Sequence, residues 1–312
     1  MIAVVGSNNT DLVLEVGHFT RVGETQKSLS FSRYPGGKGA NQAVTCKRLG
    51  AETLFLSCVG SDGNGSFIEQ LLNNEELSEH LLKCEEPNGL AVIEVCSSSG
   101  QNRIITYAGA NAFLDRAAVD SVIERMLEAD ILILQNEVPL ETTRYCARCF
   151  HDRGRYVVLD PAPAEGIDES IAPFVDLVTP NESEARTICG SSDSPRNLTK
   201  RLIKMGFGRV VLKLGDKGSY YSGPDGELSL PAFAVNTVDT TAAGDVFTGA
   251  LATALDRGKN MNYAMRFATA AAALSVMREG AQPSIPHLQE VMAFLNERYD
   301  NEEDRHHQQI SL

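Results

Sequence analysis

The sequence lacks an excess of basic residues. Its 28 Lys and Arg residues are outnumbered by 41 Asp and Glu residues, and the formal net charge is −13. A field of that sign repels phosphate backbones and anionic lipid surfaces. We therefore expect neither a nucleic-acid partner nor a membrane partner.

Long apolar runs are also missing, and we expect no leader. No run approaches the roughly 20 apolar residues of a membrane-spanning helix, and the chain begins MIAVVGS without a basic segment or cleavage signal. Seven cysteines are scattered along the chain, an odd number that fits reduced thiols better than a disulfide framework. Cys146 and Cys149 lack the second pair that would complete a zinc site, so we interpret them as helix thiols. We expect a cytoplasmic protein.

Three well-known motifs are absent. The chain contains no G-x-G-x-x-G, no G-x-x-x-x-G-K-[ST] and no G-x-S-x-G. A dinucleotide-binding dehydrogenase, a P-loop enzyme and an α/β-hydrolase are therefore disfavoured.

The apolar pattern that is present predicts an α/β fold. Short runs such as IAVVGS, LFLSCVG, DILILQNE, YVVLDPAP and VVLKLG have the length and β-branched content of buried strands. Helical patterns lie between them at 40–49, 116–128 and 141–153, and two Ala-rich helices follow at 243–257 and 261–277. Alternating strands and helices indicate a parallel sheet covered by helices.

Two regions interrupt this alternation. LVLEVGHF with KSLSFSRY, and LAVIEVCSSSGQNRIITY at 90–107, alternate apolar and polar residues between turn residues. That pattern is typical of antiparallel ribbons with one wet face. We expect a small sheet that projects from the main body as a lid.

The stretch VDTTAAGDVFTGAL, residues 238–251, predicts an anion site. An apolar helical stripe starts at Val246, so small residues occupy the helix entry and leave its N–H groups uncovered. Asp245 in that first turn would accept the proton of an attacking hydroxyl, although complementing the helix dipole would also explain an acid there. Asp239 is a phosphoryl-site residue, a helix cap or a salt-bridge partner.

Other polar residues end the apolar runs, where ligands of open α/β sheets bind. Each also has a purely structural explanation: Asn9 and Asp11 as turn formers, PGGKG as a flexible loop, and Glu184 as a first-turn helix acid.

Taken together, GGKGANQAV, PNESEA and DTTAAGD, in this order and spacing, resemble the ribokinase family of carbohydrate kinases. The resemblance covers about residues 1–295, with 296–312 as a tail. It implies a three-layer αβα sandwich around a mainly parallel sheet, with a β-sheet lid formed by about 11–35 and 88–110. It also implies ATP-dependent phosphorylation of the ribose 5-hydroxyl, Mg²⁺ as a cofactor, K⁺ as a monovalent activator, and a homodimer formed through the lids.

The resemblance further implies roles for individual residues. The catalytic residues are Ala242, Ala243 and Gly244 as the anion hole and Asp245 as the base. The sugar-binding residues, besides Asp245, are Asn9, Asp11, Gly37, Lys38, Asn41, Ala91, Ile93 and Glu137. The residues near magnesium and the nucleotide are Asn181, Glu184, Lys213, Gly215 and Gly218. The potassium site takes in Asp239, Thr241, Ser275, Arg278, Gly280 and Ser284, with Arg278 contributing its carbonyl. Lys213 stands where many ribokinases have Thr.

Two alternatives stay open. The same fold could accept 2-deoxyribose, another small sugar or a nucleoside, a choice that lid residues decide. A non-catalytic sugar sensor is a rival of another class, although a sensor has no need of a base such as Asp245.

Overall fold

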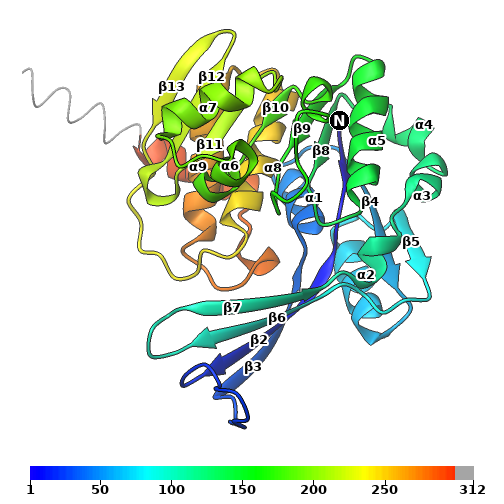
Figure 1. Ribbon diagram of the computed structural model, residues 1–312, viewed down its shortest axis with the longest axis vertical. Coiled ribbons are helices and arrows are strands. Elements are labelled where there is room, and N and C mark those ends of the chain that lie inside the picture. Colours follow the sequence, from blue (N-terminus) through cyan, green and yellow to red (C-terminus); the bar gives the residue numbers. More distant parts are fainter. Residues whose placement is uncertain (299–312) are drawn as a thin grey trace, which may run out of the picture.

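The computed structural model describes residues 1–298 (Figure 1). A nine-stranded sheet forms the centre of the main body, with the strand order β13-β12-β11-β10-β9-β8-β1-β4-β5. The strands are β1 (Ile2–Val5), β4 (Thr53–Gly60), β5 (His80–Cys84), β8 (Ile131–Leu134), β9 (Tyr156–Leu159), β10 (Leu177–Val178), β11 (Val210–Lys213), β12 (Ser219–Gly223) and β13 (Gly226–Leu230). All neighbouring pairs from β11 to β5 are parallel, and the β12–β13 hairpin adds an antiparallel edge.

Helices cover both faces of this sheet. They are α1 (Lys38–Arg48), α2 (Gly63–Asn74), α3 (Arg116–Asp120), α4 (Ile123–Met126), α5 (Leu140–Asp152), α6 (Glu182–Cys189), α7 (Pro195–Lys204), α8 (Ala243–Asp256) and α9 (Met261–Ser275), and residues 288–298 are also helical. Side chains alternate across strand β1: Ile2 and Val4 join the core under α1, α8 and α9, whereas Ala3 and Val5 join the core under α5 and α7. These two cores confirm the predicted three-layer sandwich.

A separate four-stranded sheet forms the lid, with the order β3-β2-β6-β7. Its strands are β2 (Asn9–Val16), β3 (Ser30–Gly36), β6 (Leu90–Cys96) and β7 (Asn102–Tyr107). β2 pairs with β6 in parallel, and the outer pairs are antiparallel. In Figure 1 this sheet projects below the main body, and its strands lie within or close to the predicted lid segments.

Some details differ from the sequence prediction. The helix predicted at 116–128 is two short helices, because Val122 leaves the helical region with φ −132°. Strand β5 and the β12–β13 hairpin are not among the predicted strands. The predicted tail, 296–312, lies outside the described residues except for its first three positions.

All seven cysteines are free thiols, as predicted. Within residues 1–298, no helix has both the length and the apolar character that crossing a membrane requires.

Candidate active site

The first turn of α8 provides a set of unclaimed N–H groups. Ala242 precedes the helix in the left-handed conformation, with φ 61°, and no side chain caps the helix. Ala243 N donates to the Thr240 carbonyl, whereas the N–H groups of Gly244 and Asp245 find no acceptor among the described residues. Small residues leave this turn open, so it can bind an anion.

Asp245 lies in the same turn and is buried, with 5% of its surface exposed. Its carboxylate accepts hydrogen bonds from Asn41 Nδ2 at 2.9 Å and Gln42 Nε2 at 3.2 Å, and Lys38 Nζ lies 3.9 Å away. Burial raises the pKa of Asp245, while the nearby Lys38 ammonium opposes that shift. A buried carboxylate of raised pKa at an anion site suits a general base.

The PGGKGAN loop places Lys38 and Asn41 beside this base. Gly37 has φ 88°, and a β-carbon there would lie 2.6 Å from Asn8 Cα, so only glycine fits. Glu137 accepts hydrogen bonds from Ser7 Oγ at 2.6 Å and from the Lys38 backbone N–H at 3.1 Å. Glu137 thus holds the start of α1 in position.

The hinge of the lid carries Asn9 and Asp11, and both side chains are buried. Asn9 Oδ1 accepts a hydrogen bond from Asn111 Nδ2 at 2.8 Å. The carboxylate of Asp11 packs against Gly36, where a β-carbon would overlap it. Burial, followed by the charges of Glu137 and Asp245, raises the pKa of Asp11 to about 7. Asp11 therefore lies close to Glu137 and to the base, Asp245.

Ala91 and Ile93 line the lid face that carries Asp11. Ala91 is in register with Asp11, and Ile93 with Val13. Because side chains two residues apart in a strand share a face, these four lie on one side of the lid. Ala91 is buried and Ile93 is half-buried.

A cavity of about 530 Å³ adjoins the α8 entry. Its lining includes the predicted nucleotide residues Lys213, Gly215 and Gly218, together with Ala243 and Gly244 of the anion hole. Phe233, Phe247 and Thr269 are also part of its wall. A largely apolar cavity that ends at bare N–H groups fits a base attached to phosphates.

Asn181 and Glu184 form a capping box at the start of α6. Glu184 N donates to Asn181 Oδ1 at 2.8 Å, and Asn181 N donates to Glu184 Oε2 at 2.7 Å. Burial raises the pKa of Glu184. The two side chains of the N-x-x-E pattern therefore do have a structural role, as the cap of α6. A β-bridge between Asn181 and Lys213 places the pair next to the cavity.

Asp239 joins two loops. Its carboxylate accepts hydrogen bonds from Thr241 N at 2.9 Å, Thr241 Oγ1 at 2.6 Å and Gly280 N at 2.9 Å. The Arg278 guanidinium pairs with Glu290 rather than with Asp239. Ser275 and Ser284 are fully buried near this junction of the two loops, and Val238 N donates to the Val276 carbonyl.

The model of the pfkB family carbohydrate kinases matches residues 1–288. The chain belongs to this family. Ribokinase of Haemophilus influenzae is 37% identical over 94% of this chain and 98% of its own length, and deoxyribokinase of Salmonella typhi is 34% identical over 95% and 98%.

Solved structures of this kinase family agree with that membership. Ribokinase of Thermotoga maritima is 46% identical, with a TM-score of 0.87 and coverage of 95% of this chain and 99% of that one. Ribokinase of Arabidopsis thaliana, solved with ribose and ATP, is 32% identical, with a TM-score of 0.85 and coverage of 94% and 98%.

Four site residues of this pfkB family chain escaped prediction. Asn111 forms hydrogen bonds with the Asn9 side chain and the Asn8 backbone. Gln42 donates to the base Asp245 and also to Asp160. Ser7 donates to Glu137. Gln42 lies within the quoted GGKGANQAV and Asp160 ends a predicted strand, so both carried a signal. Asn111 carried none, since its partners are more than 100 residues away.

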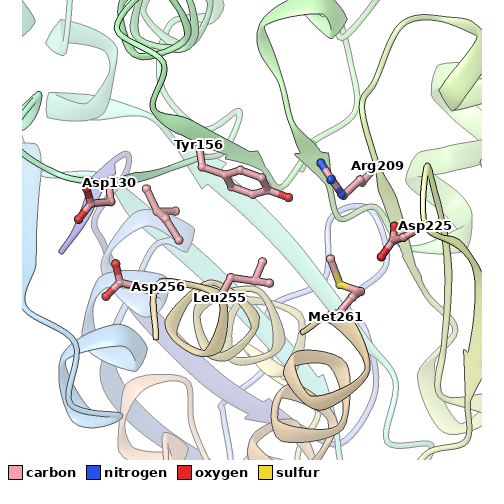
Figure 2. Close-up of a pocket in the computed structure, with 8 residues that line it drawn as sticks. Asp130, Tyr156, Arg209, Asp225, Leu255, Asp256 and Met261 are labelled. Carbon is pink, nitrogen blue, oxygen red and sulfur yellow. The ribbon is translucent and has the colours of Figure 1, made fainter. Parts of the chain in front are cut away.

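A second cavity, of about 410 Å³, lies where strands β8 and β9 begin (Figure 2). Tyr156 and Arg209 face Leu255 and Met261 across it. Asp256 nearby accepts a hydrogen bond from the Met1 ammonium group at 2.8 Å. This cavity therefore lies at the edge of the sheet where strands begin. The kinase site lies at the opposite edge, where the strands end and where ligands of such sheets bind.

Proposed function

We propose that this enzyme transfers the γ-phosphoryl group of ATP to the 5-hydroxyl of D-ribose, which yields ribose 5-phosphate and ADP. The observation that carries this proposal is the buried Asp245 carboxylate in a helix turn whose N–H groups are unclaimed. The relative from Arabidopsis that binds ribose and ATP supports the choice of substrates.

We propose an in-line transfer. Asp245 takes the proton of the sugar hydroxyl while the hydroxyl oxygen attacks the γ-phosphorus. The N–H groups of Gly244 and Asp245 stabilise the charge on the transferring group. Lys38 lowers the cost of ionising Asp245 in its buried position, so the base is available for the next turnover.

The sugar binds between the lid and α1. We propose that Asn9, Asp11, Asn41 and Lys38 bind its hydroxyls, with Glu137 adding a contact. Their side chains combine donors and acceptors, as a polyol requires. Gly37 allows close approach of the backbone, and Ala91 and Ile93 cover the apolar side of the sugar ring.

Magnesium would accompany the nucleotide at Asn181 and Glu184. These side chains are already engaged in the capping box, so they fit a hydrated ion, held through its waters, better than direct ligation. When bound, magnesium neutralises phosphate charge. Lys213, Gly215 and Gly218 line the adjoining nucleotide cavity.

A monovalent cation, K⁺, would activate the enzyme from the junction of the two loops. The carboxylate of Asp239, together with Thr241 and the backbone carbonyls around Ser275, Arg278, Gly280 and Ser284, offers hard oxygen ligands. At constant ionic strength we expect kcat to be several-fold higher in potassium than in sodium or an organic cation, about 1 kcal/mol of barrier. Equal rates in the three buffers would contradict this site.

The enzyme would form a homodimer through its lids. β7 is exposed throughout, and the exposed apolar side chains Phe31, Ile105 and Tyr107 share the lid face opposite Asp11. An apolar face of this kind marks an interaction surface. Light scattering should give twice the monomer mass, and Ile105→Glu should give the monomer; a monomeric wild-type enzyme would contradict the proposal.

We also propose that the enzyme works in the cytoplasm, where seven free thiols remain reduced.

One assay separates the candidate substrates: release of ADP with ribose, 2-deoxyribose, fructose, adenosine and ketodeoxygluconate. We expect the highest kcat/KM with ribose. The similarity to deoxyribokinase of Salmonella typhi makes 2-deoxyribose the second candidate. A higher kcat/KM with another acceptor would reassign the substrate, and sugar binding without ADP release would favour the sensor.

A further inference from the structure

Lys213 carries a charge that neither the base nor the sugar site explains. Its side chain ends strand β11 and is only 13% exposed, and its Nζ lies 2.8 Å from Asp160 Oδ1. An ammonium group has three donors. Among the described residues Asp160 is its one hydrogen-bond acceptor, so two donors remain for a ligand.

The ammonium group of Lys213 lies at the mouth of the anion hole. Lys213 lines the 530 Å³ cavity together with Gly244. A β-carbon built on Gly244 would lie 3.4 Å from Lys213 Nζ. The unclaimed N–H of Gly244 and the unclaimed donors of Lys213 therefore lie close together.

Asp160 connects this cation to the catalytic base. Its carboxylate is 1% exposed, and Asp160 Oδ2 accepts a hydrogen bond from Gln42 Nε2 at 2.9 Å. The same amide donates to Asp245 Oδ1 at 3.2 Å. Gln42 thus fixes the distance between the base and the carboxylate that holds Lys213. A buried carboxylate needs such partners, and Lys213 supplies the charge.

Building on the kinase function proposed above, we propose that Lys213 is a catalytic residue whose ammonium donates to a nonbridging oxygen of the transferring γ-phosphoryl group. In that step the sugar hydroxyl oxygen forms a bond to the γ-phosphorus and its proton passes to Asp245. The bond from the γ-phosphorus to the bridging oxygen breaks, and its electron pair leaves on ADP. Lys213 keeps its protons throughout. Asp160 is a positioning residue that acts through Lys213.

The competing explanation is that Lys213 only neutralises Asp160. A set of three variants separates the two roles: Lys213→Met, Asp160→Asn, and the double variant, which buries no unpaired charge. Lys47→Met is the matched control, because Lys47 forms an ion pair with Glu76 at 2.7 Å on the surface, away from the site. The measurements are thermal melting, kcat and ribose KM.

We expect Lys213→Met to melt at a lower temperature than wild type and to lose about 10²–10³-fold in kcat, as when one donor to a transition state is removed. Ribose KM should change little. The double variant should recover the melting temperature without recovering kcat, Asp160→Asn should lose less kcat than Lys213→Met, and Lys47→Met should match wild type. If Lys213→Met does not fold, the double variant still decides the question.

A binding measurement gives a second readout. Lys213→Met should weaken binding of ADP with aluminium fluoride and ribose, which mimics the transferring group, far more than binding of ADP alone. A wild-type kcat in the double variant would overturn the proposal. So would an equal loss of affinity for ADP alone and for ADP with aluminium fluoride and ribose. If the wild-type enzyme prefers another sugar, the ribose assignment fails, while the same variants compared on that sugar still test Lys213.

Discussion

Substitution of Gly36 by alanine tests whether Asp11 binds the sugar. A β-carbon at Gly36 would overlap all three atoms of the Asp11 carboxyl group, so the carboxylate must retreat by about 1 Å to restore van der Waals contact. A hydrogen bond lengthened by that amount leaves the usual range of about 2.5–3.2 Å. Hydrogen bonds to a charged group contribute about 1.5–3 kcal/mol each.

Loss of one such bond should raise the ribose KM about tenfold to a hundredfold, because 1.4 kcal/mol corresponds to a factor of about ten. The kcat should fall less, since Asp245 and the α8 turn are untouched. The assay is ADP release over a ribose titration, with ribose binding measured by calorimetry. Gly63→Ala is the control, because a β-carbon there meets nothing within 4 Å. A ribose KM unchanged in Gly36→Ala would refute the role given to Asp11.

Three further predictions concern the base, the lid hinge and the core. Asp245→Asn should lose about 10²–10⁴-fold in kcat while calorimetry shows ribose still bound; near-normal turnover would exclude Asp245 as the base. Folding raises the pKa of Asp11 from 3.8 to about 7, so ionisation of Asp11 costs stability as the pH rises through that window. The stability gained in Asp11→Asn, measured by urea unfolding, should therefore grow from pH 4 to pH 7, and a constant difference would contradict the burial argument. Gly249→Ala should lower the free energy of unfolding by about 1–3 kcal/mol, because its β-carbon would lie 2.8 Å from Thr45 Cβ between α8 and α1; an unchanged urea midpoint would count against it.

Much of the fold was predictable because its signals are local. Runs such as IAVV and ILIL are buried on both faces, and the alternation in β2 and β6 marks a sheet outside the main body. The failures arise where the pattern is weak or misleading. The break between α3 and α4 falls at Val122, inside an otherwise helical stretch.

The site was predictable in part for a similar reason. The small residues before Asp245 reveal a bare helix entry without reference to the rest of the chain. Contacts across the fold have no such signal: Gln42 reaches Asp160 over 118 residues and Asp245 over 203. Nor does the sequence alone say that the Glu184 carboxylate is already engaged by the Asn181 backbone.

The position of the phosphate in the product tests the proposed reaction. We would incubate the wild-type enzyme with ATP, magnesium, potassium and ribose, and follow the products by phosphorus and carbon NMR. One ADP should form for each sugar phosphate, with phosphorus coupled to carbon 5 of ribose. A phosphate on another carbon, or ADP formed at the same rate without ribose, would contradict phosphoryl transfer to the 5-hydroxyl with Asp245 as the base.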